Sequence, residues 1–206
     1  MVMFWDKVAS VYDLYSNFYN GKVNRALCQV VAKQVSGNDE VLECACGTGM
    51  ISIHIAKRCR RLVATDYSDG MLKKAARKCS DLPNVEIRKA DILQLDFPDE
   101  SFDVVIAANV IHLLDEPLKA LGELNRVCSR SGKLVIPTYV NNEKTGETSG
   151  LAKTVGKAGA DFKRQFTYSM YGRFFEDAGF RDVETVLING RVPCAVAVMR
   201  RREENR

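Results

Sequence analysis

Short runs of Val, Ile and Leu alternate with amphipathic segments over residues 40–136, and this alternation constrains the fold more than any other feature of the chain. The runs at 40–44, 61–65, 85–87, 102–108 and 132–136 have the length and apolar character of buried strands. Strands that alternate with helices at this spacing predict a parallel sheet with helices on both faces. Right-handed crossovers then give a doubly wound α/β fold.

The segments outside this core complete the expected architecture. Residues 182–188 and 192–198 read as two further strands, and the Asn189-Gly190 pair between them predicts a tight hairpin. The sheet is therefore expected to have seven strands, mostly parallel, with an antiparallel C-terminal hairpin strand. Residues 1–36 predict an N-terminal helical lid, and residues 140–166 a variable loop over one end of the sheet. A chain of 206 residues is expected to form a single domain over 1–206.

Composition excludes several classes of function. The 30 Lys and Arg exceed the 26 Asp and Glu by only four charges, so bulk charge does not indicate nucleic-acid binding. No apolar run approaches the ~20 residues that span a bilayer, and no signal peptide is recognisable, which predicts a cytoplasmic protein with no transmembrane segment. Its seven cysteines are expected to be reduced thiols. Cys44 and Cys46 lack zinc-site spacing, so no metal is expected.

A turn of small residues joins the strand at 40–44 to the helix that follows it. The strand ends in Glu43, and the turn contains Ala45, Cys46, Gly47 and Gly49. Glycines allow a ligand to approach the backbone closely, and the first turn of a helix offers free N–H groups. The turn therefore predicts a ligand site, and the alternative is a tight strand-to-helix connection that binds nothing.

Polar residues also follow the second and third strands. Asp66 ends the second strand 19 residues after Gly47, where a carboxylate accepts hydrogen bonds from both hydroxyls of a ribose in folds of this kind. Asp91 and Ile92 follow the third strand, and could hold the amine and the ring face of an adenine. The alternatives are that Asp66 and its neighbour Ser68, an expected N-cap, only open the next helix, and that Asp91 belongs to a surface turn.

The fourth strand is followed by Asn109 and His112. Ligands of parallel sheets bind outside the carboxyl ends of the strands, so both residues are candidates for the site. An unperturbed imidazole titrates near neutral pH, which makes His112 the best candidate for a general base. The alternative is that His112 caps the next loop.

Taken together, these segments resemble the motifs of class I S-adenosylmethionine-dependent methyltransferases. The turn Glu43-Cys44-Ala45-Cys46-Gly47-Thr48-Gly49 resembles motif I, Asp66 the ribose-binding acid, and Ala90-Asp91-Ile92 the adenine-contacting motif. Phe102-Asp103-Val104-Val105 and Ser131-Gly132-Lys133-Leu134-Val135 resemble the motifs of strands four and five. The opening Phe4-Trp5-Asp6-Lys7-Val8-Ala9-Ser10-Val11-Tyr12-Asp13 is similar to the N-terminal helix of the ubiquinone/menaquinone-biosynthesis methyltransferases.

The resemblance implies a Rossmann-like fold that binds S-adenosylmethionine and releases S-adenosylhomocysteine. It implies methyl transfer to a small-molecule or lipid-like acceptor by in-line displacement, a reaction that proximity and alignment can largely catalyse. Tyr12 would close the site, and His112 would act only if the acceptor must lose a proton. The expected cofactor-binding residues are Tyr12, Glu43, Ala45, Cys46, Gly47, Gly49, Asp66, Tyr67, Met71, Asp91, Ile92 and Asn109, and the expected catalytic residues are His112 and Tyr12.

The sequence departs from the family at Ala45, where glycine is usual, so the geometry of the turn is the point to examine. Two other functions share some of these features. A nicotinamide-dependent oxidoreductase has a similar turn but usually a fuller Gly-x-Gly-x-x-Gly, whereas Ser52 stands three residues after Gly49 here. A methyltransferase-fold sensor would bind the cofactor without turnover.

Overall fold

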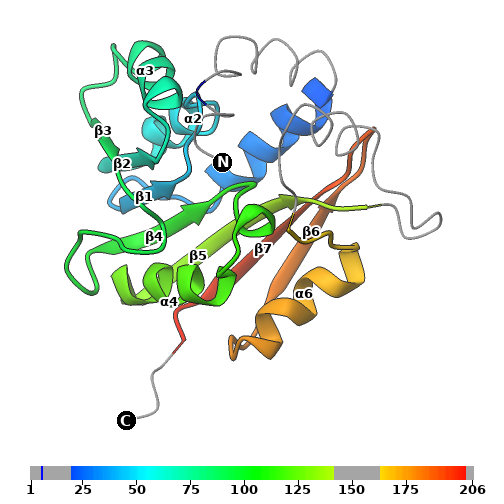
Figure 1. Cartoon of the computed structure of the whole chain (residues 1–206). Helices are drawn as coiled ribbons and strands as arrows, with labels where there is room; N and C mark the ends of the chain where they lie inside the picture. Colours follow the sequence, from blue (N-terminus) through cyan, green and yellow to red (C-terminus); the bar gives the residue numbers. More distant parts are fainter. Residues whose placement is uncertain (1–5, 7–19, 142–162, 203–206) are drawn as a thin grey trace.

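The protein is described here from a computed structural model, which covers residue 6, residues 20–141 and residues 163–202. Seven strands form one sheet in the order β3-β2-β1-β4-β5-β7-β6 (Figure 1). Only β7 runs antiparallel to its neighbours β5 and β6, and the other pairs are parallel, which confirms the predicted sheet. The strands are β1 (Glu40–Cys44), β2 (Arg61–Asp66), β3 (Val85–Lys89), β4 (Phe102–Ala107), β5 (Cys128–Tyr139), β6 (Glu184–Ile188) and β7 (Cys194–Arg200).

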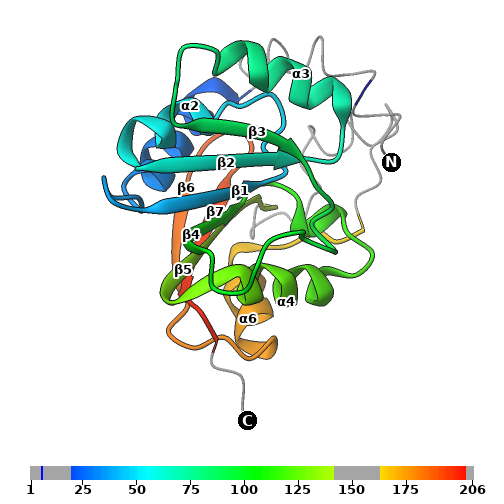
Figure 2. The same cartoon turned by 90° about the vertical axis from the view of Figure 1, so that its left-hand side faces the viewer.

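Helices cover both faces of the sheet, as Figures 1 and 2 show. Successive side chains of a strand point to opposite faces, so Val104 of β4 packs into one core and Val105 into the other. The Val104 face is covered by an N-terminal helix (residues 20–32), α2 (Ser52–Ile55), the 3₁₀ turn η1 (Ala56–Arg58) and α3 (Asp69–Lys78). The opposite face is covered by η2 (Ile111–Leu113), α4 (Pro117–Val127) and α6 (Tyr168–Asp177).

The connection between β6 and β7 differs from the tight hairpin that Asn189-Gly190 predicts. The strands are antiparallel neighbours, but five residues, 189–193, join them, and neither Asn189 nor Gly190 has the positive φ of a type I′ turn. The connection packs on the N-terminal helix instead. A Cβ on Gly190 would lie 2.1 Å from Val23 Cγ2, and the Asn20 amide donates to the Val192 carbonyl oxygen at 3.0 Å. This tertiary contact overrides the local turn preference.

The predicted lid and loop are described only in part. Of residues 1–36 the structure describes Asp6 and 20–36, so the aromatic segment that contains Tyr12 lies outside the described residues, as does most of the loop at 140–166. Within the described ranges, no helix combines the length and apolar character needed to cross a membrane.

Candidate functional site

A cavity of about 280 Å³ lies at the carboxyl ends of β1, β2 and β4. This is the edge at which open α/β sheets bind ligands. The structure brings ten of the predicted residues together around the cavity: Glu43, Ala45, Cys46, Gly47, Asp66, Tyr67, Met71, Asp91, Ile92 and Asn109. Its wall also includes residues that were not predicted, namely Thr48, Met50, Ile51, Thr65, Ser68, Ala90, Ala108, Val110, Leu113 and Leu114.

The turn after β1 depends on three residues with positive φ. Ala45 has φ +54°, Gly47 +56° and Gly49 +79°. Ala45 therefore adopts the backbone conformation of the glycine usual in the family, with the strain that a Cβ brings. A Cβ on Gly47 would meet nothing within 4 Å, whereas a Cβ on Gly49 would lie 3.2 Å from Ala75 Cα in α3. Gly47 lines the cavity, and Gly49, predicted to bind the cofactor, allows α3 to pack against the turn instead.

Asp66 connects the second strand to this turn. Its Oδ2 accepts a hydrogen bond from the Gly47 N–H and its Oδ1 one from the Ser68 N–H, both at 2.9 Å. Burial raises the pKa of the Asp66 carboxyl, although the hydrogen bonds oppose this. The Tyr67 N–H also hydrogen-bonds this carboxylate, but a carboxylate has about four lone-pair sites, so Asp66 can still accept a hydrogen bond from a ligand. Ser68 is also the N-cap of α3, because its hydroxyl accepts from the Met71 N–H.

Glu43 places a buried acid in the cavity wall. Only 1% of the residue is exposed, and the Ser52 hydroxyl donates to its Oε2 at 2.5 Å. Burial, with a smaller contribution from the negative charge of Asp66, raises the pKa of Glu43 to about 8, although the Ser52 hydrogen bond opposes the shift. The charged form lacks a cationic partner in this wall, so a ligand that brings positive charge close to Glu43 would stabilise it.

Two further predicted residues line the cavity after β3 and β4. Asp91 is exposed, and its Oδ1 accepts from the Leu93 N–H at 2.9 Å, so it also organises the turn after β3. Asn109 has φ +54°, and its N–H donates to the Pro137 carbonyl oxygen at 2.8 Å. The Asn109 Oδ1 is buried and has no hydrogen-bond partner among the described residues.

The thiols near the cavity are not nucleophiles at neutral pH. All seven cysteines are free and buried. Burial raises the pKa of Cys44 to about 12 and places that of Cys46 well above its ordinary value. A thiol reacts as its thiolate, so Cys46 contributes a neutral side chain to the wall.

The structure does not place His112 in the cavity wall. The ring is buried, and its Nδ1 lies 2.9 Å from the Thr138 hydroxyl of β5. Burial lowers the pKa of His112 to about 4, so the imidazole is neutral at pH 7 and a weak base. The η2 turn gives the cavity Leu113 and turns the ring of His112 towards β5. The expectation of a general base at this position is therefore not supported by the geometry.

The unpredicted wall residues show what sequence reasoning can find. Thr48 and Ser68 lie directly beside predicted residues, so their positions in the sequence were a usable signal. Leu113 and Leu114 give no such signal, because apolar residues after a buried strand are expected to belong to the hydrophobic core. Only the fold shows that this apolar segment faces the cavity.

Comparisons with known proteins agree on one family. Residues 42–136 match the family model described as a methyltransferase domain. The chain is 31% identical over 152 residues to a phosphatidylethanolamine N-methyltransferase from Cereibacter sphaeroides, which covers 72% of each chain. It is 34% identical over 135 residues to a demethylmenaquinone methyltransferase from Clavibacter sepedonicus, which covers 64% of this chain and 55% of that relative.

Solved structures share the architecture. A SAM-dependent methyltransferase from Aquifex aeolicus superposes with a TM-score of 0.65 at 25% identity, over 84% of this chain and 88% of that one. The structure of a DhpI–SAH complex superposes with a TM-score of 0.73 at 20% identity, over 98% and 96% of the two chains.

Proposed function

This chain belongs to the class I S-adenosylmethionine-dependent methyltransferases, and we propose that its acceptor is a lipid-like molecule whose reactive head enters the cavity beside β4. S-adenosylmethionine supplies an activated methyl group on a sulfonium sulfur. Two observations support the acceptor class. The relatives are named for phosphatidylethanolamine and demethylmenaquinone, and the wall after β4 is largely apolar, with Val110, Leu113 and Leu114.

The residues around the cavity fit this cofactor. Glu43 is a buried acid, and the cofactor carries a sulfonium and an ammonium group, so we assign Glu43 to the cationic end of the cofactor. Asp66 can still accept a hydrogen bond at the end of β2, and we assign it to the ribose hydroxyls. Asp91 and Ile92 are assigned to the adenine, and Gly47 to close backbone contact.

The acid–base groups of the wall suggest how this chain catalyses transfer. The described wall contains no histidine, and its three acids, Glu43, Asp66 and Asp91, are assigned to the cofactor. Proximity and alignment then supply most of the catalysis. This favours acceptors that are nucleophilic without a base, such as a neutral amine or an electron-rich quinol ring.

A labelled-methyl assay tests the acceptor class. Phosphatidylethanolamine and a demethylated quinol, each in detergent micelles, are incubated with methyl-labelled S-adenosylmethionine and the protein. We expect the label in at least one lipid. Label in water-soluble amines or acids alone would refute a lipid-like acceptor, and cofactor binding with no label in any acceptor would favour a sensor.

A variant pair links the acceptor to the apolar wall. Leu113→Ala removes contact area at the wall and is expected to raise the acceptor KM about tenfold, with the cofactor Kd unchanged. Leu118→Ala is the control, because Leu118 is 61% exposed on α4 and does not line the cavity. An unchanged acceptor KM in Leu113→Ala would show that this wall does not bind the acceptor.

A further inference from the structure

The charges of this protein are distributed unevenly between the two helical layers. The layer on the Val104 face, formed by residues 20–32, α2, η1 and α3, is called here the basic layer. Its elements contain eight Lys and Arg and a single acid, Asp69. Two of the cations lie on the N-terminal helix, two in η1 and four on α3. The opposite helices, α4 and α6, contain three cations and three acids, so the asymmetry belongs to one face.

The cations of the basic layer are also largely unpaired. Asp69 pairs with Lys89 of β3 at 2.7 Å, and the Lys78 ammonium lies 3.4 Å from the Thr48 hydroxyl. The other seven form no ion pair with any described acid. In contrast, Arg126 of α4 pairs with Glu123 and with Asp99. Unpaired cations on one face create a positive potential that ion pairs do not neutralise.

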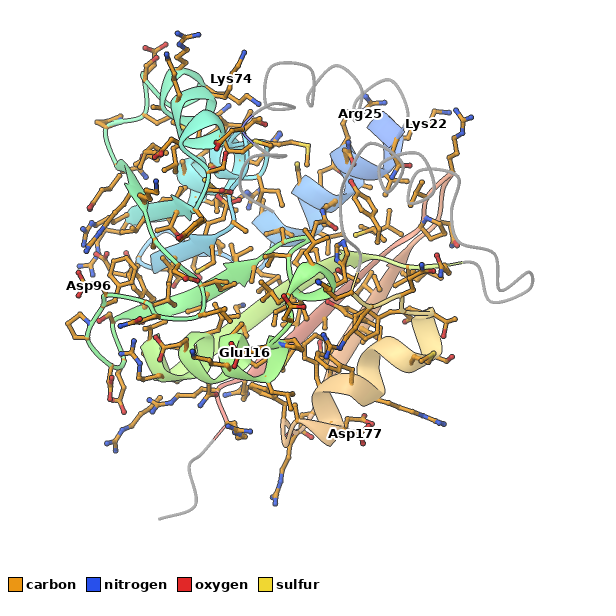
Figure 3. The ribbon with its side chains drawn as sticks, in the orientation of Figure 1. Lys22, Arg25, Lys74, Asp96, Glu116 and Asp177 are labelled. Atoms are coloured by element: carbon orange, nitrogen blue, oxygen red, sulfur yellow. The ribbon has the colours of Figure 1, made fainter. Side chains whose placement is uncertain are left out.

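The side chains extend towards solvent on the outer side of the layer. Lys73 and Arg77 are exposed, as are Lys22 and Arg25. Figure 3 shows Lys22, Arg25 and Lys74 projecting from one side of the molecule, with Glu116 and Asp177 on the opposite side. The layer borders the cavity, because Met71 of α3 and the preceding Tyr67 and Ser68 line the cavity.

We propose that the basic layer is a docking surface for the anionic surface of a phospholipid bilayer. The choice of a bilayer rests on the lipid-like acceptor proposed above. Each Lys or Arg held near an anionic leaflet strengthens binding about fivefold, so a few such residues are enough to hold the protein there reversibly. Because α3 begins at the cavity, this docking places lipid head groups beside the opening.

The same charges can attract nucleic acid, but two observations favour a bilayer. The cations are spread over three separate elements of a broad layer, and Tyr67 is the only large aromatic residue with more than half of its surface exposed in the described part of the chain. Single-stranded nucleic acid is usually held on several exposed aromatic rings. A bilayer needs only a broad surface of positive potential.

Vesicle sedimentation tests the proposal without cofactor or acceptor turnover. The full chain is mixed with phosphatidylcholine vesicles, either pure or containing phosphatidylglycerol. We expect binding only to the anionic vesicles and its loss at about 1 M salt, where the Debye length falls to about 3 Å. The variant Lys73→Gln/Lys74→Gln/Arg77→Gln removes three charges from α3 with a residue that favours helix, and should weaken binding about 100-fold.

A matched control removes the same charge from the other side. Lys119→Gln/Arg173→Gln/Arg181→Gln alters exposed cations of α4, α6 and the turn after α6, and should retain binding within about threefold. The proposal is overturned if wild type ignores anionic vesicles, if both triple variants bind equally, or if duplex DNA binds more tightly than vesicles at equal salt. Methyl transfer in micelles is measured separately: both variants should retain it, so failure of the acceptor proposal and failure of docking give different results.

Discussion

At the scale of single residues, the buried acid Glu43 makes the stability of the empty protein depend on pH. Its pKa rises from 4.5 to about 8 on burial. Between these values the folded state holds a proton that the unfolded state has lost, so stability falls as pH rises through this window and levels off above about pH 8. Glu43→Gln removes this dependence. The free energy of unfolding of the variant, relative to that of wild type, should rise by about 3 kcal/mol from about pH 5 to pH 8.

Urea unfolding across that pH range measures the effect. Glu176→Gln is the control, because Glu176 is exposed on α6 and forms no ion pair with a described residue. The difference in free energy of unfolding between Glu176→Gln and wild type should not change with pH. Parallel stability curves for wild type and Glu43→Gln would show that the buried carboxyl is ionised in the empty protein.

Ala45 gives a second prediction, which concerns backbone strain. A positive φ costs an L-residue about 1–2 kcal/mol, and glycine adds about 0.5–1 kcal/mol of unfolded-state entropy. Ala45→Gly should therefore leave stability unchanged or raise it by about 1 kcal/mol. Ala76→Gly, on the exposed face of α3, should lower it by about 1 kcal/mol. Equal losses in the two variants, measured by denaturant unfolding, would contradict the strain at Ala45.

Residue-scale prediction succeeded where local chemistry determines the position. Ser68 has the side chain and spacing of an N-cap, and it caps α3 as expected. Asp66 follows its strand directly, so its place at the carboxyl edge follows from the topology. His112 lies three residues after Asn109, and its orientation depends on η2 and on Thr138, which is distant in the sequence. That tertiary contact cannot be found in a local pattern.

At the scale of elements, the two glycines of the turn after β1 have different structural roles. A Cβ on Gly47 would project into open space, whereas one on Gly49 would push against α3. Both substitutions incur the cost of positive φ. Because alanine also lowers the entropy of the unfolded chain, Gly47→Ala should lower stability by only about 0–1 kcal/mol, whereas Gly49→Ala should also disturb helix packing and lower it by about 1–3 kcal/mol.

Cofactor affinity should rank the same two variants in the opposite order. Gly47 lines the cavity and Gly49 does not, so Gly47→Ala should weaken cofactor binding the more strongly. Thermal unfolding and calorimetric titration of each variant measure the two effects. If the same variant showed both the larger loss of stability and the larger loss of cofactor affinity, the assignment of helix packing to Gly49 and ligand contact to Gly47 would be contradicted.

Element boundaries were predictable where the sequence pattern and the sheet agree. The strand expected at 40–44 is β1 as observed. β5 extends to Cys128–Tyr139, beyond the expected 132–136, because Cys128 pairs with Phe102 of β4 and the strand pairs with β7 from Lys133 to Tyr139. The length of a strand depends on its partner strands as well as on its own residues. This explains why the middle of each strand was easier to predict than the residues at which it begins and ends.

At the scale of the whole molecule, the net charge does not show how the charged residues are distributed between the two helical layers. An excess of four positive charges is small, but the fold collects eight cations on one helical layer. The alternating pattern predicted the sheet and the edge that carries the cavity. It could not show which helices share a face, and so could not show the basic layer.

The central claim is that the cavity at the carboxyl edge binds S-adenosylmethionine through Asp66. The most direct measurement is calorimetric titration of wild type, Asp66→Asn and Asp103→Asn with S-adenosylmethionine, and of wild type with NADH. Asp103 is the matched control, because its Oδ2 accepts from the Glu40 N–H at 2.9 Å at the opposite edge of the sheet. We expect micromolar binding to wild type and Asp103→Asn, about 10–100-fold weaker binding to Asp66→Asn, and none of NADH. Equal affinity in all three proteins, or binding of NADH alone, would contradict the account.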